Sequence, residues 1–176
     1  NLNSAASAFD PEKLLWVNGQ HMRSAEPEKL AGLLQPFLTA GGVPDDDKGL
    51  ILRSIPLIQP RASSLVEMAE NLKPLLTPVA RLAYDAAALA KAMTDEGRRH
   101  VRALRDRLAA LQVFDREGVH ACIHGYVEEM GIKFKAIGPP LRVSLLGTSG
   151  GPDLADTMAA IGREESLARL DKALTA

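Results

Sequence analysis

The residue types that commonly carry chemistry gather at two places in this sequence. The first is the stretch CIHGYV at residues 122–127, in which a cysteine and a histidine, Cys122 and His124, stand two positions apart. The second is the glycine-rich stretch GTSGG at residues 147–151, which follows Arg142. A cysteine beside a histidine could act as an activated nucleophile, and a glycine-rich loop beside an arginine could hold a phosphate group.

Neither stretch carries the full pattern of a catalytic site. Side chains two positions apart on a helix point in different directions, so Cys122 and His124 do not face each other. The glycine-rich stretch has no lysine after it and is therefore not a nucleotide-binding P-loop. His21, His100 and His120 have no metal-ligand spacing with one another. The residues therefore predict neither catalytic groups nor a metal site.

The composition is that of an ordinary soluble globular protein, which we expect to be cytoplasmic. Of the 176 residues, 46% are hydrophobic and 24% are charged, and no apolar run approaches the roughly 20 residues of a membrane span. The single cysteine excludes an internal disulfide. The net charge of −1 argues against a strongly basic nucleic-acid binder, although residues 91–107 form a basic stretch. Because the sequence begins with Asn1 and not Met, we expect either a piece of a longer protein or a processed chain.

Apolar residues recur with the period of an α-helix along most of the chain. The repeats predict buried stripes at Leu30, Leu33, Leu34, Phe37 and Leu38, at Val101, Leu104, Leu108 and Leu111, at Val119, Cys122, Ile123, Tyr126, Val127 and Met130, and at Leu167, Leu170 and Leu174. No segment alternates as a strand would. We expect an all-α fold of eight or nine helices in two packed helical subdomains, residues 1–80 and 81–176.

Start and stop signals fit these helices. Helix starts are predicted at four capping residues, two of which precede a proline: Asp10, Ser64 with Glu67, Thr77 and Asp115. Helix ends are predicted at Gly131 and Gly162. Pro36 falls late in its helical pattern and is expected to kink or end that helix.

Three stretches resemble one family. The stretches FDPEKLLWVNGQHMR at residues 9–23, IQPRASSLVEMAE at residues 58–70 and PPLRVSLLGTSGGPDLADTMAAIGREESLARLDKAL at residues 139–174 are similar, in the same order, to the anticodon-binding region of bacterial glutamyl-tRNA synthetases. The resemblance implies a helical region that recognises the anticodon loop of tRNA-Glu. The last stretch is the most specific of the three.

The two ATP-binding motifs of that family, the HIGH and KMSKS types, do not occur in this sequence. The resemblance therefore implies the C-terminal, tRNA-binding part of a class I glutamate–tRNA ligase without its catalytic domain. We expect this chain to be inactive alone, to bind no cofactor and to be monomeric. ATP and Mg²⁺ would bind in the missing catalytic domain, which would be its partner within the parent enzyme.

The resemblance implies that Arg61 reads the third anticodon base. Glutamate anticodons end in C and glutamine anticodons end in G. Cytosine offers the acceptors N3 and O2 on its Watson–Crick edge, whereas guanine offers N–H donors there, and arginine has only donors. Arg61 would therefore favour C, since leaving buried donors unmatched costs roughly 1–3 kcal/mol.

Further contacts are implied in the C-terminal stretch, where Arg142 would touch a base and Leu154 would pack against one. At Gly151 the family can have threonine, so only a backbone contact remains there, and Asp153 replaces a usual glycine. The helix with basic residues is a second candidate surface, for contact with the tRNA backbone through Arg98, Arg99 and Arg102. A solvated helix face explains those arginines equally well.

Two alternatives stay open. The chain could come from a non-discriminating or tRNA-Gln-specific paralogue of the same family. It could instead be an all-α protein-interaction module that binds no RNA.

Overall fold

The structure is a computed structural model that describes residues 11–43 and 47–176. These residues form ten α-helices and three short 3-10 helices, and they contain no β-strand. The elements are α1 (Pro11–Ser24), α2 (Pro27–Ala40), α3 (Lys48–Ile58), η1 (Gln59–Arg61), α4 (Leu65–Leu76), η2 (Val79–Arg81), α5 (Ala86–Ala92), α6 (Asp95–Ala109), α7 (Arg116–Met130), η3 (Phe134–Ala136), α8 (Gly138–Leu146), α9 (Leu154–Ile161) and α10 (Arg163–Thr175). The all-α prediction is confirmed, with one or two α-helices more than expected.

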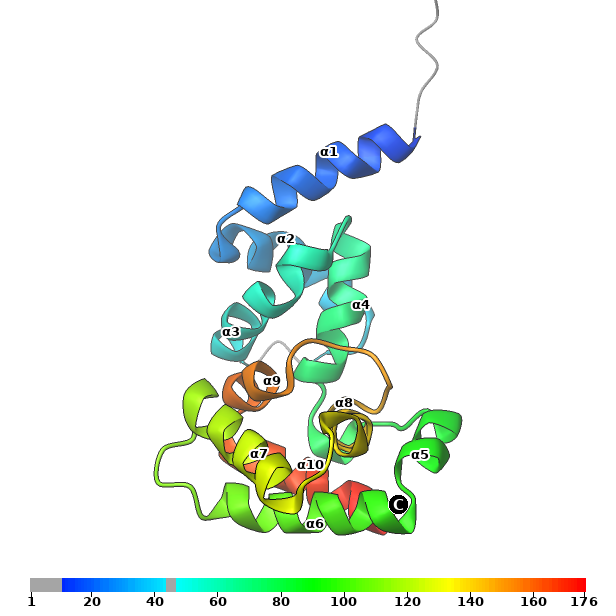
Figure 1. The fold of residues 1–176 in the computed structure, drawn as a ribbon. Helices are drawn as coiled ribbons and strands as arrows, with labels where there is room; N and C mark the ends of the chain where they lie inside the picture. The colour runs from blue at the N-terminus through cyan, green and yellow to red at the C-terminus, as the bar shows by residue number, and fades with distance from the viewer. Residues whose placement is uncertain (1–10, 44–46) are drawn as a thin grey trace, which may run out of the picture.

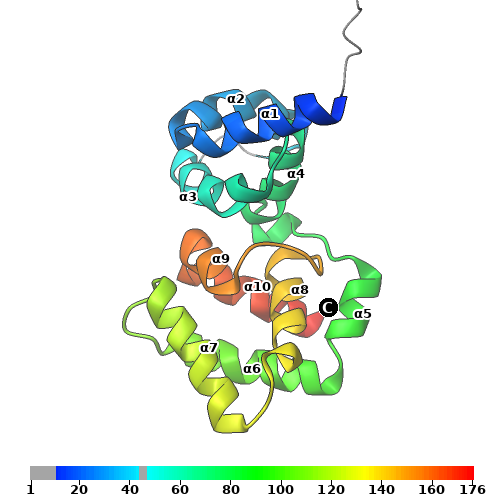
Figure 2. The same cartoon turned by 45° about the horizontal axis from the view of Figure 1, so that its top comes forward.

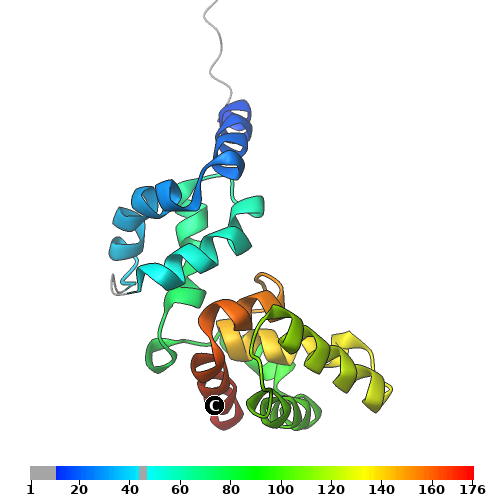
Figure 3. The same ribbon diagram turned by 90° about the vertical axis from the view of Figure 1, so that its left-hand side faces the viewer.

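The helices form two groups (Figures 1 and 2). In the first group α2, α3 and α4 pack against one another, and α1 lies at its outer end (Figure 3). In the second group α10 packs against α6, α8 and α9, and α7 packs against α6 and α9. The groups meet where α9 packs against α3 and α4. Because the buried apolar side chains form one continuous cluster, the division at residue 80 stays a prediction.

The predicted stripe on α2 is narrower than the sequence suggested. Leu30, Leu34 and Leu38 are buried against α3 and α4, in a row with a spacing of four residues. Leu33 and Phe37 lie in the neighbouring row and are 48% and 39% exposed. They are apolar residues of the right period, but no element in the described ranges covers their side of the helix.

The other stripes are largely buried as predicted. Val101, Leu104 and Leu108 of α6 are buried, and α6 packs against α10, on which Leu170 is buried as well. On α7 the stripe ends earlier than expected, because Met130 at its last position is exposed. None of the helices in the described residues has the length and apolar character needed to cross a membrane.

Several helix boundaries follow the predicted signals. The hydroxyl of Ser64 accepts a hydrogen bond from the backbone N–H of Glu67 at 3.1 Å, and the carboxylate of Glu67 accepts one from the N–H of Ser63 at 2.8 Å. Asp115 accepts from the N–H of Gly118 at 2.8 Å and begins α7. Gly131 and Gly162 end α7 and α9. These four predictions are confirmed, since each signal acts within a few residues.

Of the predictions around proline, one is wrong, one is tested only in part, and a third falls outside the described residues. Thr77 does not begin a helix; it is the C-cap of α4, and Pro78 comes before η2. The residue before a proline is pushed toward extended backbone, which ends a helix as readily as it precedes one. Helix α2 runs through Pro36 to Ala40, so Pro36 does not end it, and the alternative of a kink at Pro36 stays a prediction. The predicted cap at Asp10 lies outside the described residues.

Candidate nucleic-acid interface

The side chains of Arg61 and Arg142 reach the same backbone oxygen. Nη1 of Arg142 donates to the carbonyl of Gly151 at 2.8 Å and to that of Pro152 at 2.7 Å. Nη1 of Arg61 lies 3.5 Å from the same Gly151 oxygen, a long and weak hydrogen bond. The structure therefore brings together two of the arginines that the sequence singled out, from the two groups of helices.

A cavity of about 300 Å³ lies beside these arginines, and we call it the arginine cavity. It lies between α3 and α4 on one side and the end of α8 with the following loop on the other. It is lined by Leu57, Ile58, Arg61, Glu70, Asn71, Pro74, Leu146, Thr148, Gly150, Gly151 and Pro152. Apolar walls with a few polar groups at the rim are typical of a small-ligand or single-base site.

The turn that carries Arg61 is held by α1 and by the connector between α1 and α2. It ends η1, and Gln59 in the same turn donates to the carbonyls of Met22 and Ala25, both at 2.8 Å. The side chain of Asn18 donates to the carbonyl of Ser63 at 2.8 Å. The segment that carries Arg61 is thus fixed at both ends while its guanidinium stays exposed.

Arg142 lies in the middle of α8, a helix that begins with Gly138, Pro139 and Pro140. Burial lowers the pKa of its guanidinium, the positive charge of Arg61 lowers it further, and the carboxylate of Asp153 acts in the opposite direction. Two like charges beside one partly buried oxygen favour acceptor groups at the same place. The Nε and Nη2 groups of Arg142 have no hydrogen-bond partner among the described residues.

Gly151 contributes its backbone. Its φ of 143° is a conformation that residues with a side chain rarely adopt, and a Cβ there would clash with a terminal methyl of Leu146. A threonine does not fit this backbone without movement. The carbonyl of Gly151, which both arginines approach, is thus the group that this position offers.

The other end of the loop is anchored to the connector between α4 and α5. Gly147 has a φ of 74°, and its carbonyl accepts a hydrogen bond from the N–H of Asp85 at 2.8 Å. A Cβ at Gly147 would clash with the carbonyl oxygen of Ala83. The absence of a side chain at Gly147 therefore allows the loop backbone to pack closely against that connector.

Leu154 does not line the arginine cavity. It is 2% exposed and begins α9, where Asp153 caps the helix by accepting from the N–H groups of Ala155 at 2.9 Å and Asp156 at 3.1 Å. Asp153 thus has a local structural role that a glycine cannot fill. The predicted packing of a base against Leu154 stays a prediction, and in this structure its side chain belongs to the core.

Arg98, Arg99 and Arg102, the three arginines of α6 proposed to contact the tRNA backbone, lie apart from the arginine cavity, since α6 forms the end of the molecule opposite α1 (Figure 1). Arg98 is occupied: it donates to the carbonyls of Met93, Ala173, Leu174 and Ala176 at 2.9–3.3 Å. Arg99 and Arg102 are exposed, and nothing in the described part of the chain pairs with them. Of the three proposed residues, Arg99 and Arg102 therefore present free guanidinium groups for a phosphate, and Arg98 does not.

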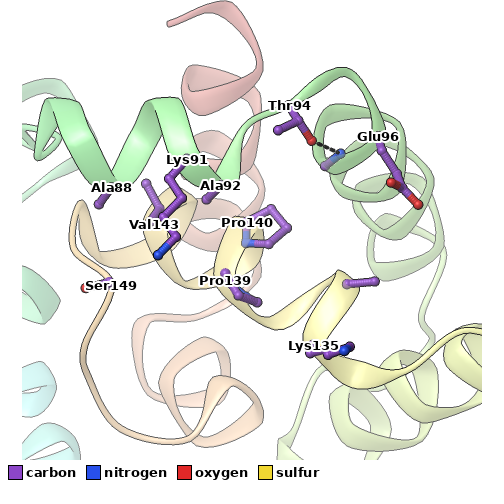
Figure 4. A pocket seen from close by; sticks show the side chains of 12 residues that line it. Ala88, Lys91, Ala92, Thr94, Glu96, Lys135, Pro139, Pro140, Val143 and Ser149 are labelled. Atoms are coloured by element: carbon purple, nitrogen blue, oxygen red, sulfur yellow. Dashed lines mark hydrogen bonds between the residues drawn. The ribbon is translucent and has the colours of Figure 1, made fainter.

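A second cavity, of about 370 Å³, lies on the other side of the same loop (Figure 4). Lys91 of α5 and Lys135 of η3 stand on either side of Pro139 and Pro140, and Ser149 reaches it from the loop. Because Thr148 and Gly150 line the arginine cavity, the loop tip separates the two cavities.

Two features escaped the sequence patterns. His120 and His124 stack with ring centroids 4.1 Å apart, and Phe134 lies 6.4 Å from His124. The spacing of four residues between the histidines is a signal for this pairing. Arg169, which is 1% exposed, lies in the core and lines a separate cavity of about 250 Å³. No residue pattern marks it, because arginines are almost never fully buried. Within the described residues, no group of three or more His, Cys, Asp or Glu side chains could hold a metal ion.

A family model described as an anticodon binding domain matches residues 29–174. The chain belongs to this family. Its similar proteins include glutamate–tRNA ligases of Nitratidesulfovibrio vulgaris, 51% identical over 174 residues, and of Oleidesulfovibrio alaskensis, 48% identical over 173 residues. These alignments cover 99% and 98% of this chain but 37% of each relative.

Solved structures agree with these relatives. A glutamate tRNA ligase from Elizabethkingia meningosepticum, crystallised with its amino acid, superposes with a TM-score of 0.82 at 28% identity and covers 96% of this chain. The glutamate–tRNA synthetase of Elizabethkingia anophelis gives 0.78 at 27% identity. This chain spans about a third of either protein. The resemblance to the anticodon-binding region of glutamyl-tRNA synthetases is confirmed.

Proposed function

We propose that this chain reads the anticodon loop of tRNA-Glu as the C-terminal part of a glutamate–tRNA ligase. Single-stranded loops are recognised through the edges and faces of unstacked bases, which needs a few placed groups rather than a large basic surface. The arginine cavity supplies such groups, and a net charge of −1 is compatible with them.

The convergence of Arg61 and Arg142 on Gly151 is the observation that carries this proposal. The Arg61 bond of 3.5 Å is weak enough to be exchanged for hydrogen bonds to a base. Cytosine presents two acceptors to such a guanidinium, and guanine presents donors that leave it unpaired. Arg61 therefore favours a third anticodon base C, as in tRNA-Glu, over the G of tRNA-Gln.

The ligation reaction belongs to the parent in this proposal. Attaching glutamate to tRNA requires ATP and Mg²⁺. The described residues offer no group of carboxylates suited to a metal, and the loop at 147–151 has no lysine after it. We assign both to the catalytic part of a monomeric, cytoplasmic parent enzyme, and we expect no ligation by this chain alone.

Binding of short anticodon stem-loop RNAs tests the proposal. Two RNAs that differ only in the third anticodon base, C or G, are titrated against the chain by fluorescence anisotropy at two salt concentrations. We expect tighter binding to the C form by up to about two decades. Arg61→Gln is expected to bring the ratio of the two dissociation constants close to one.

The matched control is Arg81→Gln, which removes an exposed arginine that lines neither cavity. It should leave the ratio unchanged. Equal binding of both RNAs by the unaltered chain would instead favour a non-discriminating or tRNA-Gln-specific parent. An absence of salt-dependent binding to either RNA would favour a protein-interaction module, because every phosphate contact adds to the salt dependence.

A further inference from the structure

The guanidinium of Arg169 is fully buried and fully hydrogen-bonded. It donates from Nε to the carboxylate of Glu165 at 2.8 Å. Its two Nη groups donate to four backbone carbonyls at 2.6–3.1 Å, those of Pro74, Leu75, Thr77 and Leu145. All five N–H donors of the side chain are therefore used.

These carbonyls belong to the last turns of two helices, α4 and α8. The last four carbonyls of a helix have no partner within it, and they form the negative end of the helix dipole. Burial lowers the pKa of Arg169, and the carboxylate of Glu165 raises it. A buried charge of this kind is kept only where its hydrogen bonds are complete, so the group is sensitive to small movements of either helix.

Arg169 itself lines a different cavity, of about 250 Å³, but the backbone that it holds adjoins the arginine cavity. Pro74, whose carbonyl it holds, lines that cavity, and so does Leu146, the neighbour of Leu145. The clamped end of α4 is opposite the end that adjoins Arg61, and Leu145 lies one turn from Arg142 on α8. Through one side chain, α10 thus fixes the end of α4, the helix that follows the Arg61 turn, and the end of α8, the helix that carries Arg142.

The length of α4 makes the hydrogen bonds at its C-terminal end important for the position of its N-terminal end, next to Arg61. Helix α4 has 12 residues and is therefore about 18 Å long. A tilt of about 6° around its clamped end would move the other end by about 2 Å over that length. Hydrogen bonds to a base edge tolerate a range of only about 0.5 Å.

Lys172, one turn later on α10, holds the chain segment that follows α4. Its ammonium donates to the carbonyls of Val79 at 2.8 Å and Leu82 at 2.6 Å, and it lies 5.7 Å from the ring centre of Tyr84. The connector between the two groups of helices is therefore tied to α10 at two successive points.

We propose that Arg169 is a positioning residue for specificity: it sets the placement of Arg61 relative to Arg142 and thereby the preference for the third anticodon base. The inference rests on the proposed function. It adds a residue that touches no RNA and acts through the end of α4.

The test measures the ratio of dissociation constants for the C and G stem-loops, well below the melting temperature of each variant. Arg169→Lys keeps the charge but loses the forked donor group. We expect the ratio to fall by about five- to tenfold. In combination with Arg61→Gln, Arg169→Lys should have no further effect on the ratio, because the position of Arg61 then no longer matters. Lys172→Met, a milder change at the same connector, should lower the ratio by about twofold and decides the matter if Arg169→Lys does not fold.

The control is Arg163→Lys, at the start of the same helix. Arg163 donates to the carbonyls of Leu111 and Gln112 within the second group of helices and reaches neither α4 nor Arg61. A purely structural role would lower the melting temperature and leave the ratio unchanged in Arg169→Lys, and that result would overturn the inference. A failure of the proposed function appears separately, in the unaltered chain, as a loss of binding or of the C preference.

Discussion

Arg61 and Arg142 share one acceptor, the carbonyl oxygen of Gly151, but they hold it unequally. Arg142 makes a short hydrogen bond of 2.8 Å and adds a second one to Pro152, whereas Arg61 lies at 3.5 Å. The two arginines therefore have different tasks in the unbound protein. Arg142 fixes the loop that follows α8, and Arg61 is left available for a ligand.

This difference predicts unequal effects of the two arginines on the free energy of unfolding. Arg142→Met should lower the free energy of unfolding by about 1–3 kcal/mol, because two carbonyls lose a charged donor. Arg61→Met should change it by less than about 0.5 kcal/mol, as most exposed substitutions do. Urea denaturation of both variants measures this. A larger loss in Arg61→Met than in Arg142→Met would contradict the assignment.

Gly147 should be one of the least replaceable residues of the loop. In Gly147→Ala the new methyl group meets the carbonyl of Ala83 at a φ of 74°, so we expect a loss of about 2–4 kcal/mol. Gly125→Ala is the matched control, since a Cβ at Gly125 on the exposed side of α7 meets no atom within 4 Å. Alanine there should raise stability by about 0.5–1 kcal/mol. Chemical denaturation of both variants measures these changes in the free energy of unfolding. Equal losses would show that the close approach of Gly147 to Ala83 does not matter.

The three arginines of α6 proposed to contact RNA, Arg98, Arg99 and Arg102, should separate into a structural residue and two binding residues. Arg98→Gln removes donors from carbonyls at the end of α10, so it should lower the melting temperature and leave the salt dependence of RNA binding unchanged. Arg99→Gln and Arg102→Gln should leave the melting temperature unchanged. If α6 touches the RNA backbone, each should reduce the slope of log affinity against log salt by about one. A full-length tRNA is the appropriate ligand, because α6 lies far from the arginine cavity (Figure 1).

The free energy of unfolding should decrease at alkaline pH because the thiol of Cys122 loses its proton. Burial raises the pKa of its thiol above the ordinary value of 9.0, and nearby Arg107 offsets part of this increase. The unfolded chain then loses the proton at a lower pH than the folded chain does. The contribution is fully present below pH 9.0, and it is lost as the pH rises from there through the pKa of the folded state.

Urea denaturation at neutral and alkaline pH measures this dependence. Cys122→Ala should have a smaller decrease between the two conditions than the unaltered chain, since alanine has no proton to lose. Tyr84 and Tyr126, whose pKa values burial also raises, contribute the decrease that remains. An identical decrease in both proteins would contradict the prediction.

Local signals in the sequence account for much of the fold. The caps at Ser64 and Asp115 and the glycine ends of α7 and α9 act within a few residues, and the structure has them where they were expected. The stripe on α2 was only half right, because periodicity shows which residues are apolar but not which side of a helix another element covers. Leu33 and Phe37 were for this reason predicted to be buried, although they are exposed.

The candidate site, like the fold, could be predicted only where local sequence signals determine it. The sequence motif singled out Arg61 and Arg142 separately, but their convergence on Gly151 depends on how the two groups of helices pack. The structural roles of Arg98 and Arg169 could not be predicted from the sequence. Each holds carbonyls that are 75 or more residues away along the chain, and their residue type alone predicts a solvated surface.

The hydrogen bonds from Arg169 to the carbonyls at the ends of α4 and α8 also affect the order in which the protein folds during synthesis. Synthesis runs from the N-terminus, so α4 and Arg61 leave the ribosome while α10 is still untranslated. The carbonyls of Pro74, Leu75 and Thr77 must therefore remain solvated, or find other partners, until residue 169 emerges and takes them over. The first group of helices can fold early, but its final alignment with the second waits for one of the last side chains translated in this sequence.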